Sequence, residues 1–65
     1  MFSFGDFVEQ RGPGWTSRGI VLKRCGDTLH VARMDDPHDL RTLTGDVWTL
    51  DARQCRMVFQ FDPQP

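Results

Sequence analysis

The densest group of side chains that could do chemistry lies at 35–39, where the sequence reads Asp-Asp-Pro-His-Asp. Carboxylate and imidazole groups are ligands that divalent cations accept. A calcium loop needs alternate ligand spacing and a glycine at its bend, and a zinc site needs further His or Cys ligands. Because these features are missing, we interpret Asp35–Asp39 as a solvated acidic loop and expect no metal and no cofactor.

The two cysteines are the residues best suited to nucleophilic or redox chemistry. Cys25 and Cys55 belong to no Cys-x-x-Cys pair, so their spacing is not that of a metal knuckle. Reduced thiols, a disulfide, or a reactive cysteine with His30 or His38 as its base all remain open. We favour reduced thiols, as is usual in the cytoplasm, and predict no catalytic residue.

Basic residues gather on one predicted hairpin. Arg18, Lys23 and Arg24 lie along it, and Arg33 is on the paired strand. Beside Trp15, such a patch could hold a phosphate backbone and stack a base. Acidic residues alternate with these basic ones, and a mixed surface is the interpretation we favour. The hairpin is therefore our alternative site, for nucleic acid.

The candidate protein-binding residues are Trp15, Trp48 and Phe4. Trp48 follows Val47 in a predicted strand, and small barrels seldom bury large groups on both faces of one strand. One of the two should therefore point outward, where it favours an interface. Phe2 and Phe4 also add apolar groups before the first strand, and together with Phe59 and Phe61 they could form a cluster that seals the end of the barrel, which is the commoner arrangement. This surplus of apolar side chains predicts self-association or an unidentified protein partner.

Short apolar runs separated by glycine and proline must position these residues. No window of about 11 residues both repeats apolar residues at the spacing of a helix and lacks helix-breaking residues such as glycine and proline. The sequence therefore argues against helices. We expect strands at 7–10, 19–23, 28–34, 47–50 and 55–59. Between them we expect a first long loop that begins with the breaker cluster at 11–14 and contains Trp15. We also expect a polar loop at 35–43, a tight turn at 44–46 and a helical turn capped by Asp51.

Length and charge exclude several classes of protein. A chain of 65 residues is one domain at the lower limit of what a single core stabilises. Eight Lys and Arg against nine Asp and Glu give a net charge of −1, which lacks the positive field of a duplex-binding protein. No apolar run approaches the roughly 20 residues that span a bilayer. The first residues lack the pattern of a signal peptide, so we expect a cytoplasmic protein with no membrane contact.

The order of the predicted elements resembles that of the SH3-like small barrels. Phe-Gly-Asp-Phe-Val at 4–8 looks like their opening, and Gly-Ile-Val at 19–21 is similar to the start of their second strand. The stretch 45–58 looks like their last two strands and the intervening turn. The resemblance implies an all-β, five-stranded barrel over residues 1–61, with a short 3-10 turn before the last strand and a flexible tail at 62–65.

Within these barrels, the layout is similar to the type II dihydrofolate reductases carried by plasmids and integrons, which share one active pore among four copies. Their pore strand reads Val-Gln-Ile-Tyr, whereas this chain has Val-Trp-Thr-Leu at 47–50. Trp48 replaces the glutamine that binds pterin and nicotinamide, and Leu50 replaces the tyrosine. We therefore expect a non-catalytic module for protein interaction that forms a homo-oligomer, and a shared-pore enzyme is the least favoured alternative.

Overall fold

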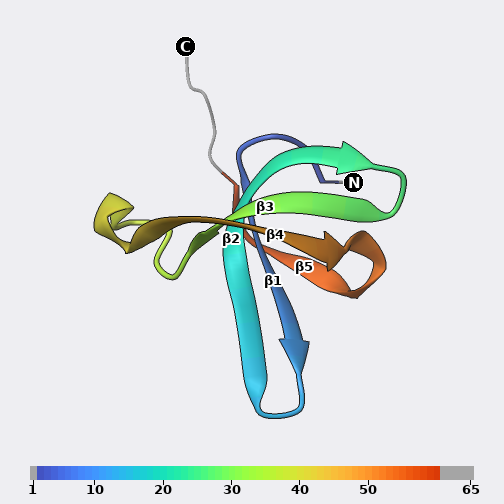
Figure 1. The fold of residues 1–65 in the computed structure, drawn as a ribbon, viewed down its shortest axis with the longest axis horizontal. Helices are drawn as coiled ribbons and strands as arrows, with labels where there is room; N and C mark the ends of the chain where they lie inside the picture. The colour runs from blue at the N-terminus through green and yellow to red at the C-terminus, as the bar shows by residue number, and fades with distance from the viewer. Residues whose placement is uncertain (1, 61–65) are drawn as a thin grey trace.

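The computed structural model describes residues 2–60 and forms one antiparallel sheet of five strands (Figure 1). The strands are β1 (Asp6–Gly12), β2 (Trp15–Cys25), β3 (Thr28–Met34), β4 (Leu43–Asp51) and β5 (Cys55–Gln60). They lie in the order β4-β3-β2-β1-β5, so β4 and β5 are the outer strands. The predicted all-β class is confirmed. The predicted tail at 62–65, like Phe61, lies outside the described residues.

β2 is the longest strand and belongs to both halves of the sheet. Its residues 15–20 pair with β1, and its residues 19–25 pair with β3. In Figure 1 the strand bends midway, from the direction of β1 into that of β3. Gly19 lies at this junction, where a Cβ atom would overlap the carbonyl oxygen of Ala32 and the side chain of Val31. The close approach of β3 therefore requires a glycine.

A small aliphatic core lies on one face of the sheet. Its members are Val8, Val21, Leu29, Val31 and Leu50. Partly buried side chains pack against it from Phe2, Trp48, Ala52 and Cys55. Phe7 and Met34 are also fully buried, apart from this cluster. With so few buried apolar groups, many large apolar side chains remain at the surface.

The strand boundaries differ from prediction at two glycine-containing stretches. The loop expected at 11–14 is only a two-residue turn, Pro13–Gly14, and Trp15 is therefore the first residue of β2 rather than part of a long loop. The tight turn expected at 44–46 is wrong, because these residues lie within β4. A register shift in the pairing of β3 with β4 accommodates Gly45 at a φ of 87°.

Two 3-10 turns flank β4, and both begin with a capping aspartate. η2 (Ala52–Gln54) is the predicted turn before the last strand, and Asp51 accepts a hydrogen bond of 2.9 Å from the backbone N–H of Arg53. η1 (Leu40–Thr42) was not predicted; it replaces part of the expected polar loop. In the part of the chain that the structure describes, no helix is long and apolar enough to cross a membrane.

Candidate functional site

A buried carboxylate on β1 organises the most strongly charged region of the molecule. Val8 belongs to the aliphatic core, and successive residues of a strand point to opposite faces, so Glu9 points away from that core. Its side chain is nevertheless only 1% exposed. A buried carboxylate is costly unless it is paired, and the residues that cover Glu9 supply the pairing.

Three arginines cover Glu9 and bind it. Arg18 of β2 and Arg56 of β5 are the direct register partners of Glu9 on the two neighbouring strands. Arg11 lies two residues along β1 and so shares its face. Each donates a hydrogen bond from Nε, at 2.8 Å for Arg11 and Arg18 and 2.9 Å for Arg56. We call these four residues the Glu9 cluster.

The Glu9 cluster is a local excess of positive charge. The hydrogen bond from Arg18 is the largest cause of a lowered Glu9 pKa; burial opposes it, and the bonds from Arg56 and Arg11 add to it. Three cations and one anion leave +2 in a chain whose net charge is −1. The arginine side chains remain 45–64% exposed, and their hydrogen bonds to Glu9 use Nε, which leaves the Nη groups free of Glu9. This arrangement can hold an anion.

Of the basic residues predicted to form a nucleic-acid patch, Arg18 is the member that joins this cluster. Lys23 and Arg24 lie further along β2 and are exposed. Arg24 donates a hydrogen bond of 2.6 Å from Nε to the carbonyl oxygen of Gly26. Arg24 therefore binds within its own molecule, at the turn between β2 and β3.

Arg33 lies on the other face of the sheet from Arg18. Its register partner on β2 is Gly19, the next residue after Arg18, and adjacent residues of a strand point to opposite faces. The guanidinium carbon of Arg33 lies 5.2 Å from the ring centre of Trp48, a cation–π distance. The four predicted basic residues thus do not share one surface.

The predicted protein-binding residues lie in different environments. Phe4 is exposed before β1, and Trp15 is partly exposed at the end of the β1–β2 hairpin. Trp48 is half-buried against the core, whereas Val47 is 58% exposed. Of the two neighbours on β4, Val47 is therefore the one that points outward.

A second candidate surface lies along β4. Three large apolar side chains are exposed on this strand and on the turn before it: Leu40, Leu43 and Val47. β4 is the last strand of the sheet at its end, so one of its edges has no strand partner among residues 2–60. We call this surface the β4 edge. The sequence prediction missed Leu40 and Leu43, because it assigned both to a polar loop.

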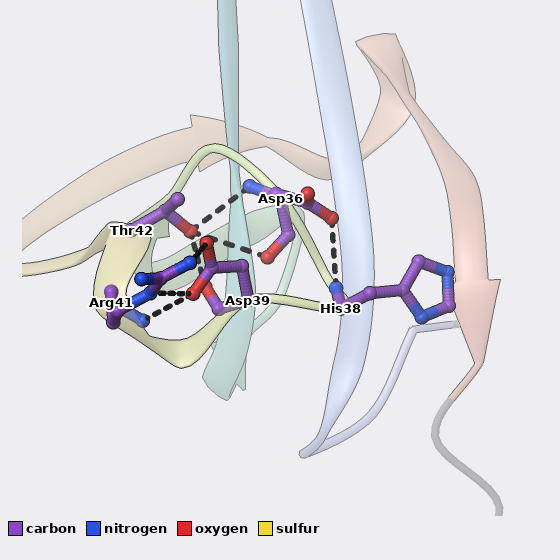
Figure 2. Close-up of polar contacts among 5 residues, drawn as sticks. All are labelled: Asp36, His38, Asp39, Arg41 and Thr42. Atoms are coloured by element: carbon purple, nitrogen blue, oxygen red, sulfur yellow. Dashed lines mark hydrogen bonds and ion pairs between the residues drawn. The ribbon is translucent and has the colours of Figure 1, made fainter.

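The acidic loop before β4 is held by its own contacts (Figure 2). Asp39 accepts hydrogen bonds from Nε and Nη2 of Arg41, at 2.9 and 3.0 Å. The carboxylate of Asp36 accepts from the backbone N–H of His38, and Thr42 Oγ1 donates to the carbonyl oxygen of Asp39. Figure 2 shows the imidazole of His38 directed away from both carboxylates. In the described part of the chain, no three His, Cys, Asp or Glu side chains are grouped as a metal site.

The two cysteines are free and differ in environment. Cys25 is exposed at the end of β2, and Cys55 is half-buried at the start of β5. Burial, with a smaller contribution from Asp51, raises the pKa of the Cys55 thiol. A raised pKa keeps this thiol protonated at neutral pH, and a protonated thiol is a poor nucleophile.

Comparisons with known proteins add no relative. No protein-family model matches this chain, and neither a curated protein nor a solved structure matches it. A function must therefore be inferred from the chemistry of the Glu9 cluster and of the β4 edge.

Proposed function

We propose that the protein is a non-catalytic, SH3-like interaction module that forms homo-oligomers through the β4 edge. One observation carries this proposal: an outer strand that has no second neighbour among residues 2–60 exposes several large apolar side chains. An unpaired edge of this kind readily pairs with another strand. A second copy of the chain supplies both the missing strand and the apolar cover, in a symmetric interface.

The burial of β4 supports an interface at this strand. Of its nine residues, only Leu50 is buried, although β4 also contains Leu43, Val47 and Trp48. A strand in an antiparallel sheet normally alternates between buried apolar and exposed polar residues. The exposed fractions of Leu43 and Val47 are 46% and 58%, so apolar groups stand where polar ones are usual. A small domain also gains stability when a partner covers such groups.

The aromatic residues predicted to bind protein take different parts in this proposal. Trp48 packs on the core and under Arg33, so it supports β4, and Val47 takes the contact role. Trp15 and Phe4 are exposed and remain candidate contacts for a protein partner. We also propose a cytoplasmic location, where free cysteines stay reduced.

Light scattering coupled to size-exclusion chromatography tests the proposal. At micromolar concentration we expect the mass of two chains or more. Val47→Lys puts a charge on the β4 edge, and charged residues on an edge oppose strand pairing. We therefore expect this variant to be monomeric at concentrations where the wild type is associated.

Leu22→Lys is the matched control. Leu22 is also an exposed apolar residue, but it lies on β2, an inner strand of the sheet, within the stretch that pairs with β3. This variant should keep the oligomeric mass. A monomeric wild type contradicts the proposal, and so does an equal loss of mass in the Val47 and Leu22 variants.

A further inference from the structure

We propose that the Glu9 cluster is a second functional surface, which binds the phosphate groups of a single-stranded nucleic acid. The geometry that points to it is a buried carboxylate that holds three arginines by their Nε atoms. Their outer Nη groups remain available to a ligand. This site is separate from the β4 edge, because it lies on β1, β2 and β5.

Glu9 positions the arginines before a ligand arrives. An arginine on a surface samples many rotamers, and fixing them costs entropy on binding. Here each guanidinium is already anchored at Nε, so less freedom remains to be lost. The planar Nη groups match pairs of phosphate oxygens and form charge-assisted hydrogen bonds. The cluster is thus preorganised for an oxyanion.

The cluster also keeps most of its charge. Among the described residues, Glu9 is the only carboxylate that forms an ion pair with Arg11, Arg18 or Arg56. Arg41, by contrast, binds the carboxylate of Asp39 through two of its nitrogens, which makes a neutral pair. An anion is therefore attracted to the Glu9 cluster although the chain as a whole is slightly acidic.

The openness of the site favours a polymer over a small anion. The three arginine side chains are 45–64% exposed, and two depressions of about 230 and 250 Å³ near η2 are lined by other residues. A small anion on an open surface stays largely hydrated. A nucleic acid gains free energy from the counterions released at each phosphate, and this gain does not require a pocket.

The shape of the site favours a single strand. Arg18, Glu9 and Arg56 form a row across three adjacent strands, and a sheet face of this kind can track an extended backbone. The helical segments among residues 2–60 are three-residue turns. No such turn fills a major groove as a recognition helix does, so duplex DNA is a poorer ligand.

Fluorescence anisotropy with a labelled oligothymidylate of about 15 nucleotides tests the site, since this length covers the footprint of one small barrel. We expect binding at low salt that weakens as salt rises. Each phosphate contact with a single strand contributes about −0.7 to the slope of the logarithm of the association constant against the logarithm of the salt concentration. Three arginines, each with one phosphate, should therefore give a slope of about −2.

Two single variants and a control assign the binding to the cluster. Arg11→Gln and Arg56→Gln each leave Glu9 with two arginines, and each should reduce the slope by about 0.7 and the affinity several-fold. Arg41→Gln removes the same charge from an exposed site at η1, and it should change neither value by a comparable amount. Circular dichroism of each variant checks that the fold is kept.

Other outcomes overturn the proposal. Flat anisotropy at low salt would exclude the ligand, and an equal effect of Arg41→Gln would indicate general charge attraction. Tighter binding of a duplex of the same length would exclude a single strand as the preferred ligand. Competition by polyglutamate at equal charge concentration would indicate an acidic peptide, and saturation by inorganic phosphate without oligonucleotide binding would indicate a small-anion site.

Discussion

The Glu9 cluster and the two capping pairs use the same side chains in opposite ways. At η1 and η2, an aspartate is followed two residues later by an arginine: Asp39 by Arg41, and Asp51 by Arg53. Each aspartate caps its turn and also binds its own arginine through Nε and Nη2. Each pair is neutral, and its arginine is exposed and has a partner from the same short segment.

Glu9 also has an arginine two residues later, but the strand changes the outcome. Residues 9 and 11 share a face of β1, and neighbouring strands place two further arginines beside them. One buried carboxylate therefore holds three cations. The comparison shows that the spacing of an acid and an arginine sets only the local pair. Strand register decides how many cations are left to meet a ligand.

Removal of the Glu9 charge should have the largest effect on the stability of the fold. Glu9→Gln should lower the free energy of unfolding by about 2 kcal/mol, because charge-assisted hydrogen bonds are lost and three guanidinium groups repel one another. Urea denaturation followed by tryptophan fluorescence measures this change. Asp39→Asn is the matched control and should shift the midpoint much less. Equal shifts in the two variants would show that the buried carboxylate is no more stabilising than a capping one.

An intermediate effect is expected from acid. The pKa of Glu9 is lowered from its usual value of 4.5, so its contribution to stability is fully present above that value and is lost as the pH falls through the lowered pKa. Urea midpoints measured between neutral pH and pH 3 should therefore fall more steeply for the wild type than for Glu9→Gln. Parallel curves for the two proteins would contradict a lowered Glu9 pKa.

The smallest expected effect is at the capping pairs. Asp51→Asn removes a charge but keeps an oxygen that can accept the hydrogen bond from the backbone N–H of Arg53. The thermal midpoint should fall slightly at low salt and approach that of the wild type at high salt, since ions screen exposed pairs. Differential scanning calorimetry at two salt concentrations measures this. A large fall in the thermal midpoint that does not depend on salt would indicate that Asp51 stabilises the fold as Glu9 does.

Local features of this molecule could be predicted from the sequence. β3 has the predicted bounds, Thr28–Met34, and Asp51 caps η2 as expected, because both depend on residues close together in the chain. The pairing of Glu9 with Arg18 could also have been predicted from the sequence. A two-residue turn at Pro13–Gly14 places these two residues opposite each other, but the breaker cluster suggested a longer loop.

Features that depend on distant parts of the chain could not be predicted. Arg56 meets Glu9 only because β5 returns to pair with β1, and nothing local fixes that register. The exposure of Leu43 and Val47 likewise depends on β4 being the outer strand. The turn expected at 44–46 failed for the same reason, because a shift in the pairing with β3 lets Gly45 remain in a strand.

Because β2 is shared by both halves of the sheet, we expect the two halves to unfold together. Residues 15–20 of β2 complete one half of the sheet and residues 19–25 complete the other, so the two halves are joined through one continuous strand. The domain should therefore unfold cooperatively, as one unit, with slow hydrogen exchange centred on β2. A nucleic acid on the Glu9 cluster and a second copy on the β4 edge would each suppress the same global opening.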